Sequence, residues 1–243
     1  MSIKINLNYS PNFDSKKRNL SQIKFIIFHY TGMKKEKKAI HRLTDLKSKV
    51  SCHYLIKGNG QIIKMIPELY ISWHAGISGW LNYKNLNKNS LGIEISNPGH
   101  KFNYKKFSKK QILSLVKLSK YLIKKFNIKS NFILGHSDIA PDRKQDPGEK
   151  FPWKLLSKNK IGIWHNLSSY KLIKERNNKI NNFDKKTFIS NLYKIGYPRN
   201  NNIEEEKYKK FLIKTFQRRF RQELINGIID KECLIISESL LKK

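Results

Sequence analysis

Several features that mark exported, disulfide-bonded or membrane-spanning proteins are missing from this sequence. It holds two cysteines, Cys52 and Cys233, which lie far apart without a CxxC partner, so we expect no disulfide framework. No stretch approaches 18 apolar residues, and the N-terminal segment lacks the apolar core of a secretory signal. These absences predict a cytoplasmic protein without a transmembrane segment. The alternative is the periplasm or cell envelope, if a precursor segment is missing from the sequence.

Acidic residues are scarce as well, because 50 Lys and Arg stand against 18 Asp and Glu, for a formal net charge of +32. A field of this strength attracts nucleic acids, anionic cell walls and anionic membranes alike. Only eight of the basic residues are Arg, and Lys, Asn and Ile abound, as an AT-rich coding sequence tends to produce. No nucleic-acid reading module is recognisable, so we predict no specific nucleic-acid partner.

What the sequence does hold is enough apolar material for a folded core, with 39% hydrophobic and 12% aromatic residues. Strand and helix patterns alternate over its first part. The expected elements are a strand at residues 25–28, a helix at 33–48, a hairpin at 50–66, a strand at 90–96, a helix at 108–126 and a strand at 131–136. Their order predicts an α/β domain over residues 1–170, in which helices flank a mixed central β-sheet.

Strand patterns stop where the chain becomes polar and rich in Asn, between residues 167 and 182. Three amphipathic segments follow at residues 183–197, 204–222 and 230–243, and Gly and Pro supply the breaks between them. We therefore predict a second, all-α domain over residues 180–243, built as a small three-helix bundle.

Three ionisable side chains stand where a site would be built. His29 and His136 end two predicted strands, and Asp146 follows in a loop stiffened by Pro141 and Pro147. A catalytic zinc takes about three protein ligands from imidazole or carboxylate and leaves a further position for water. These residues meet that count, yet their spacing matches no local metal motif, and strand-end histidines are often structural. The pattern alone leaves metal binding and a structural role open.

Glu94 joins these candidates because it stands inside the apolar strand expected at residues 90–96. Burying a carboxylate without a partner is costly. We therefore expect a cationic group to face Glu94.

The other polar residues of the loop after His136 carry simpler expectations. Asp138, Asp142 and Arg143 are expected to brace the loop by hydrogen bonds. Glu149 and Lys150 are expected to lie on the solvated surface.

At the level of whole motifs, the sequence resembles a known family. The segments FIIFHYTG, SCHYLIKGNGQI, SWHAGIS, SLGIEISNPG and GHSDIAPDRKQDPGEKFPW occur in the order found in the zinc-dependent N-acetylmuramoyl-L-alanine amidases of the type 2 family. That family also includes phage amidase-type lysozymes and peptidoglycan recognition proteins. The similarity extends over residues 20–165.

The resemblance implies one Zn²⁺ per chain, bound by His29, His136 and Asp146. It also implies that Glu94, the acid of the GIE motif, takes and returns the catalytic proton. Lys144, two positions before the last ligand, is implied to stabilise the developing oxyanion.

Several aromatic residues are candidates for contact with the substrate. Trp73 and His74, in the WHAG motif, are candidate substrate-binding residues, with packing as the alternative for both. Trp80 has the same two alternatives, stacking on sugar or peptide and packing. For His53 we expect a structural role.

The activity that the resemblance implies is hydrolysis of the amide bond between N-acetylmuramic acid, or its 1,6-anhydro form, and L-alanine. Peptidoglycan or muropeptides are then the substrate, and the process is cell-wall turnover and recycling by a monomer. The alternative is a non-catalytic peptidoglycan-binding receptor, against which the complete metal set argues. The preference between anhydromuropeptides and intact wall stays open, and we favour an enzyme that accepts both.

The segment KTFQRRFRQELINGIIDKEC carries a second resemblance, to the peptidoglycan-binding domain type 1. That domain is a three-helix bundle often fused to cell-wall hydrolases, so the resemblance implies a tail that binds glycan or stem peptide. The alternative is that Phe211, Phe216 and Phe220 only form the core of the bundle. A wall-binding tail favours the envelope, whereas the missing signal favours the cytoplasm.

Overall fold

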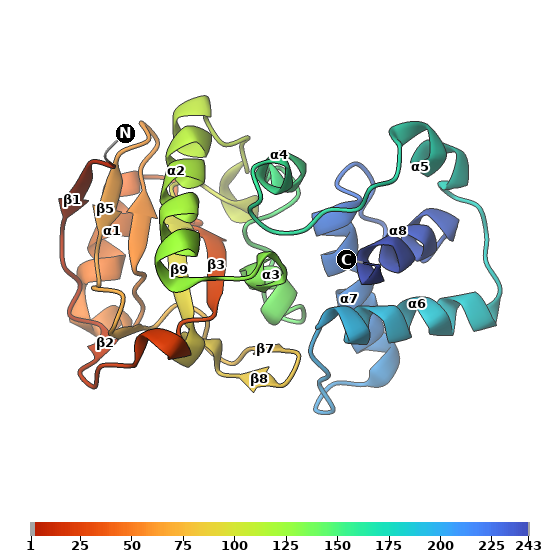
Figure 1. Cartoon of the computed structure of the whole chain (residues 1–243), viewed down its shortest axis with the longest axis horizontal. Coiled ribbons are helices and arrows are strands. Elements are labelled where there is room, and N and C mark those ends of the chain that lie inside the picture. Colours follow the sequence, from red (N-terminus) through yellow and green to blue (C-terminus); the bar gives the residue numbers. More distant parts are fainter. Residues whose placement is uncertain (1–2, 243) are drawn as a thin grey trace.

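A mixed six-stranded sheet is the centre of the first part of the molecule in the computed structural model, which describes residues 3–242 (Figure 1). Its strands run in the order β1-β5-β4-β9-β3-β10, and every neighbouring pair is parallel except the antiparallel pair of β4 and β5. The strands are β1 (Ile5–Leu7), β3 (Phe25–Tyr30), β4 (Tyr54–Ile56), β5 (Ile62–Lys64), β9 (Ser90–Ile95) and β10 (Ile133–Gly135). Short two-stranded ladders pair β2 (Phe13–Asp14) with β6 (Ile71–Ser72) and β7 (Gly79–Trp80) with β8 (Tyr83–Lys84). The expected α/β class with a mixed sheet is confirmed.

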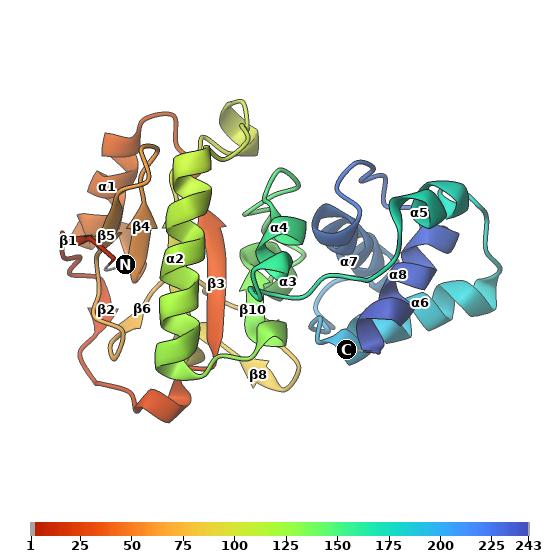
Figure 2. The ribbon, with the colours of Figure 1, turned by 45° about the horizontal axis from the view of Figure 1, so that its top comes forward.

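Helices cover both faces of this sheet and continue beyond it (Figure 2). They are α1 (Glu36–Thr44), α2 (Lys109–Phe126), α3 (His136–Ile139), α4 (Trp153–Lys158), α5 (Ser169–Glu175), α6 (Asn182–Ile195), α7 (Glu205–Phe220) and α8 (Lys231–Leu241). On one face, Leu118 of α2 belongs to the same buried apolar cluster as Ile26 and Phe28 of β3. On the other face, Leu43 of α1 belongs to a cluster with Leu55 of β4.

The alternation of side chains along β3 decides where its ionisable group emerges. Ile26 and Phe28 face α2, so Phe25, Ile27 and His29 face the opposite side of the sheet. Residues 25–28 all have 0% exposure, as expected for a strand buried on both faces. The His29 side chain therefore lies near the end of the strand, on the face of the sheet opposite α2.

Local capping explains the bounds of α2. The Ser108 hydroxyl accepts a hydrogen bond from Gln111 N at 3.1 Å, and the Gln111 side chain accepts one from Ser108 N at 3.0 Å. The helix ends at Asn127, whose left-handed backbone (φ 51°) is a common way to close a helix.

Two parts of the chain differ from the sequence-based expectation. Residues read as a polar lead include β1, which pairs with β5 at the edge of the sheet. The polar segment after residue 167 contains α5, because the Ser168 hydroxyl caps it by accepting from Lys171 N at 3.3 Å. The three expected helices of the tail correspond to α6, α7 and α8.

The helical tail packs against the sheet unit through one shared apolar cluster. Phe25 and Ile27 of β3 belong to the same buried cluster as Leu212, Phe216 and Phe220 of α7. Phe216 and Phe220 are 0% and 2% exposed, as the packing alternative for the tail requires. Both views place α3 and α4 between the sheet and α7 (Figures 1 and 2). Across residues 3–242, no helix combines the length and the apolar character needed to cross a membrane.

Candidate active site

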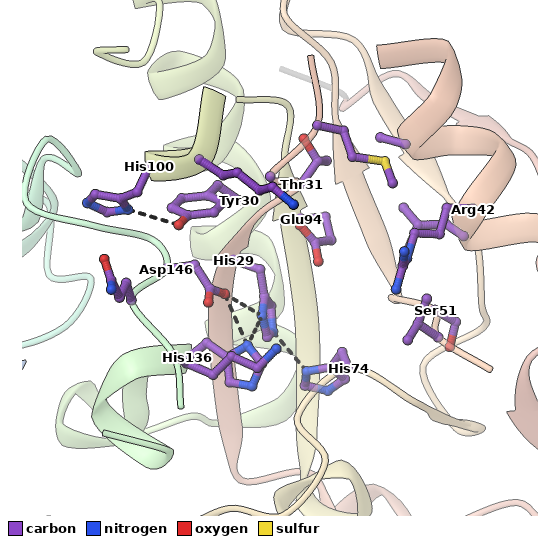
Figure 3. A pocket seen from close by; sticks show the side chains of 18 of the residues that line it. His29, Tyr30, Thr31, Arg42, Ser51, His74, Glu94, His100, His136 and Asp146 are labelled. Atoms are coloured by element: carbon purple, nitrogen blue, oxygen red, sulfur yellow. Dashed lines mark hydrogen bonds and ion pairs between the residues drawn. The ribbon is translucent and has the colours of Figure 1, made fainter. Parts of the chain in front are cut away.

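Two histidines meet at the carboxyl edge of neighbouring parallel strands. β3 and β10 lie side by side, with Phe28 opposite Gly135, so the next residue of each chain segment is a histidine at the same edge. The Nδ1 atoms of His29 and His136 are 2.9 Å apart. The Asp146 Oδ2 atom lies 3.1 Å from each of them (Figure 3). The structure thus brings together the three residues that the sequence put forward as zinc ligands.

The second ring nitrogen of His136 fixes the state of the first. His136 Nε2 lies 3.1 Å from the carbonyl oxygen of Ala75. A carbonyl only accepts hydrogen bonds, so Nε2 carries the proton and donates it. His136 Nδ1 is therefore unprotonated and presents a lone pair to His29 and Asp146.

A longer chain of hydrogen bonds fixes the state of His29 in the same way. It begins at the Ser90 hydroxyl, which donates to the carbonyl oxygen of Leu86 at 2.6 Å. The Ser90 oxygen then accepts from His74 Nε2 at 3.0 Å, and His74 Nδ1 accepts from His29 Nε2 at 2.9 Å. His29 Nδ1 is left without a proton. Burial, helped by the His136 ring, lowers the pKa of His29 to about 4, so the ring is neutral near pH 7.

The resulting donor set fits a metal cation. Two imidazole lone pairs and a carboxylate oxygen converge without a proton between them, an arrangement that is repulsive unless a cation lies there. Ligand atoms bonded at about 2.1 Å to one tetrahedral ion lie about 3.4 Å apart, close to the separations in this cluster. His29, His136 and Asp146 are 1%, 4% and 8% exposed, so little of these three side chains is in contact with bulk solvent.

Glu94 stands beside this cluster because β9 is in register with β3. Glu94 lies directly opposite His29 in the parallel ladder and faces the same side of the sheet. Within the part of the chain that the structure describes, its buried Oε2 atom has no hydrogen-bond partner. Burial raises the pKa of Glu94 to about 8; the Asp146 carboxylate acts in the same direction and the Lys144 ammonium in the opposite one. Its carboxylate can therefore take up a proton near neutral pH.

A cleft of about 540 Å³ joins these residues, and Glu94, Lys144 and the cluster all line it. A ligand pocket of a few hundred Å³ is typical of small-molecule sites. A cationic group was expected near Glu94, and the Lys144 side chain lines the same cleft. The site has a candidate metal cluster, a protonatable carboxylate and an ammonium group around one open volume.

Comparison with known proteins agrees with this geometry. The family model described as N-acetylmuramoyl-L-alanine amidase matches residues 19–149. N-acetylmuramoyl-L-alanine amidase AmiD of Escherichia coli K12 is 33% identical over 234 residues, which cover 91% of this chain and 83% of that protein. This chain belongs to the N-acetylmuramoyl-L-alanine amidase family.

A solved structure of AmiD and one further relative extend the comparison of this amidase. The solved structure of AmiD in complex with anhydro-N-acetylmuramic acid-L-Ala-D-γ-Glu-L-Lys has a TM-score of 0.81 and 32% identity, and the match covers 94% of this chain and 92% of that one. The 1,6-anhydro-N-acetylmuramyl-L-alanine amidase AmpD of Haemophilus influenzae is 30% identical over 163 residues, 60% of this chain and 86% of that protein. The similarity to AmiD therefore includes most of the helical tail.

The remaining candidates for substrate contact occupy different places in the amidase. Trp73 and His74 line the cleft, but His74 is half-buried and both its ring nitrogens are engaged in hydrogen bonds. Trp73 Nε1 donates to Asp14 Oδ1 at 2.7 Å. Trp80 is 1% exposed and packs on Tyr197 with ring centroids 5.1 Å apart, so the packing alternative holds for it. His53 is buried and structural: its Nδ1 accepts from the backbone amide of Gly92.

The loop that carries Asp146 is braced largely as expected. Arg143 Nη2 donates to the carbonyl oxygen of Ala75 at 2.6 Å, and Arg143 Nε donates to that of Ile77 at 3.1 Å. Asp138 is 1% exposed and accepts from Gly135 N at 2.8 Å. Asp142 has a weaker contact, 3.5 Å from Asn200 Nδ2. The Arg143 bonds hold the loop against the WHAG segment and the residue that follows it.

One expectation for the loop was met only in part, and the contact concerned involves residues that sequence reasoning missed. Glu149 is half-buried rather than fully solvated, and its Oε2 lies 2.9 Å from His100 Nε2. His100 Nδ1 in turn lies 2.9 Å from the Tyr30 hydroxyl (Figure 3). Tyr30 directly follows His29 in the sequence, so its proximity to the site could have been predicted. The pairing of His100 with Glu149 joins residues 49 positions apart and leaves no pattern in the sequence.

Proposed function

We propose that this chain hydrolyses the amide bond between N-acetylmuramic acid, including its 1,6-anhydro form, and L-alanine in muropeptides or peptidoglycan. The observation that carries the proposal is the pair of unprotonated Nδ1 atoms of His29 and His136, 2.9 Å apart, within 3.1 Å of a carboxylate. The AmiD complex with an anhydromuramyl tripeptide supports a substrate of this class.

We assign His29 Nδ1, His136 Nδ1 and the Asp146 carboxylate as the ligands of one zinc ion. Zinc bound there would polarise the scissile carbonyl and lower the pKa of a water molecule to about 7. Hydrogen bonds from the far ring nitrogens to His74 and Ala75 keep both rings in the tautomer and orientation that this binding requires.

Glu94 and Lys144 supply the proton transfer and the charge stabilisation. The unpartnered Glu94 Oε2 would accept a proton from the attacking water and later return it to the nitrogen of the leaving L-alanine. The Lys144 ammonium, in the same cleft, would donate to the oxygen on which negative charge develops. Because Glu94 and His29 are neighbours in the ladder, the base and one of the proposed ligands are held by the same sheet.

Incubation of the purified chain with anhydromuropeptides and with intact sacculi tests the proposal. Release of stem peptides that begin with L-alanine, lost to a chelator and restored by Zn²⁺, is the expected result. Binding of zinc and of muropeptide without any product would instead favour a non-catalytic peptidoglycan-binding receptor.

We further propose that residues 1–170 form the catalytic domain and residues 180–243 a peptidoglycan-binding helical domain. The support is the similarity of the tail segment to the peptidoglycan-binding domain type 1. Tyr170, just before this domain, and Phe183 are 79% and 77% exposed, and exposed aromatic rings suit stacking on sugar. The full chain should co-sediment with sacculi, and Tyr170→Ala/Phe183→Ala should reduce co-sedimentation without slowing hydrolysis of small muropeptides.

The proposed site draws all its groups from one chain, so a monomer is sufficient for activity. Gel filtration with light scattering tests this state. Cell fractionation would distinguish the cytoplasm from the envelope.

A further inference from the structure

A buried carboxylate next to the metal cluster is held from the helical tail. Asp138 lies two residues after His136 in α3 and is 1% exposed. Its Oδ2 accepts from Gly135 N at 2.8 Å and from Arg219 Nη1 of α7. Its Oδ1 accepts from the Tyr197 hydroxyl at 3.2 Å. Two of the three donors to Asp138 therefore come from the tail.

Arg219 reaches both sides of His136. Besides Asp138, it donates from Nη2 to the carbonyl oxygen of Ile133 at 3.2 Å, in the strand that precedes His136. Its guanidinium also lies over the ring of Trp153 of α4, 4.2 Å from the centroid. Arg219 is 3% exposed, so these contacts are made in a dry interior. One side chain of α7 thus ties together β10, α3 and α4.

The orientation of α3 bears on two of the proposed ligands. α3 begins at His136, so its direction sets where the imidazole points. The next amide, Ser137 N, donates to the carbonyl oxygen of Asp146 at 2.8 Å. A shift of α3 would therefore move His136 and Asp146 together relative to His29.

We propose that Arg219 and Tyr197 are positioning residues, through which the helical tail holds α3 so that His136 and Asp146 face His29. The proposal rests on the ligand set assigned above. The pair of Arg219 and Asp138 is suited to this role because its two charges are buried and compensate each other, and removing one leaves the other charge buried and uncompensated. Partners that orient a ligand typically change metal affinity by about 10- to 100-fold when removed.

A second buried ion pair in the tail supplies a matched control. Arg221 pairs with Asp230 at 1% and 3% exposure, and the described contacts of Arg221 stay within the tail. Arg221→Gln therefore removes a buried charge from the same region without touching α3. It separates loss of tail stability from loss of ligand positioning.

The experiment compares Arg219→Gln, Arg219→Lys, Tyr197→Phe and Arg221→Gln in the full chain. Zinc affinity is measured by competition with a chromophoric chelator, and thermal unfolding is followed in parallel. We expect Arg219→Gln to weaken zinc binding by about 10- to 100-fold, Tyr197→Phe and Arg219→Lys to weaken it less, and Arg221→Gln to leave it unchanged. Equal zinc affinity in Arg219→Gln and Arg221→Gln would overturn the proposal. If Arg219→Gln does not fold, the comparison of Tyr197→Phe with Arg221→Gln decides.

A metal-free measurement separates this proposal from the proposed function. Hydrogen exchange of residues 133–146 in chelator-treated protein should quicken in Arg219→Gln and Tyr197→Phe but not in Arg221→Gln. If exchange is faster in these two variants while the wild-type protein hydrolyses no muropeptide, the positioning role stands and the amidase assignment fails. Unchanged exchange in both variants would remove the positioning role even for an active amidase.

Discussion

The Nε2 atom of His29 lies 2.9 Å from Nδ1 of His74, and this contact determines which nitrogen of His29 faces the cleft. His74 Nδ1 can accept a hydrogen bond from His29 because His74 Nε2 carries the proton of its ring and donates it to the Ser90 oxygen. The Ser90 hydroxyl in turn donates to the carbonyl oxygen of Leu86. The direction of the whole chain is thus set by one backbone carbonyl. His74, a residue of the WHAG motif that was put forward as a candidate substrate contact, is therefore placed to orient a proposed zinc ligand.

Replacement of His74 tests this role directly. His74→Ala should weaken zinc binding by about 10- to 100-fold, because His29 loses the partner that fixes its tautomer. Ser90→Ala, one step further away, should cause a smaller loss. Chelator competition measures both affinities, and muropeptide KM is measured at saturating zinc. A rise in KM with unchanged zinc affinity would show that His74 contacts the substrate instead.

Glu94→Gln should separate catalysis from metal binding. The amide keeps the shape of the side chain but cannot accept the proton, so kcat should fall by about 10²- to 10⁴-fold. Zinc affinity should stay near that of the wild type, since Glu94 is not among the assigned ligands. The melting temperature should not fall, because the change removes a buried carboxylate whose Oε2 has no partner in the described structure. Wild-type turnover by Glu94→Gln would assign the proton transfer to another group.

The elements that carry the site were predictable because they have strong local patterns. The apolar run that ends at His29 is a strand in the structure, and so is the run that contains Glu94. Strand ends at His29 and His136 suggested that the two residues could meet, and the parallel pairing of β3 with β10 brings them together. The carboxyl ends of parallel strands lie at the same edge of a sheet, so residues at two such ends could be predicted to lie close together.

Contacts that support the site could not be predicted, because they depend on packing between distant segments. The pair of Asp138 and Arg219 joins residues 81 positions apart and needs α7 to dock on α3. The contact of His136 with the Ala75 carbonyl involves a backbone atom, which every residue possesses. From the sequence, Trp80 could be an exposed aromatic residue of a loop, but in the structure its ring packs against Tyr197 of the tail. Neither charge nor hydrophobic period distinguishes such residues from their neighbours.

Lys144→Met should lower kcat by about 10²- to 10³-fold, the usual effect of removing one oxyanion partner. KM and zinc affinity should change little, because the ammonium acts on charge that develops only in the transition state. The matched control is Lys154→Met, an exposed lysine of α4 that does not line the cleft. If both variants slow turnover equally, the effect comes from net charge and not from the position of Lys144.

A buried carboxylate outside the candidate metal cluster should control acid stability. Glu68 is 6% exposed; Tyr54 Oη donates to it, and Lys64 Nζ and Lys125 Nζ lie 3.1 and 3.4 Å from its Oε1. Burial alone would raise the pKa of Glu68, but the Tyr54 hydroxyl and the Lys64 ammonium outweigh it and lower the pKa to about 2. A carboxyl group whose pKa is lower in the folded state stabilises that state above its unfolded pKa.

The Glu68 contribution should therefore be complete above the unfolded value of 4.5 and disappear as the pH falls toward 2. At pH 7, Glu68→Gln should lower the free energy of unfolding by about 2 kcal/mol, the worth of hydrogen bonds to a charged group. Urea unfolding of wild type and variant at a series of pH values measures the difference, which should shrink between pH 4.5 and 2. A difference that stays constant over this range would mean that the Glu68 charge contributes nothing and that only the shape of the side chain matters.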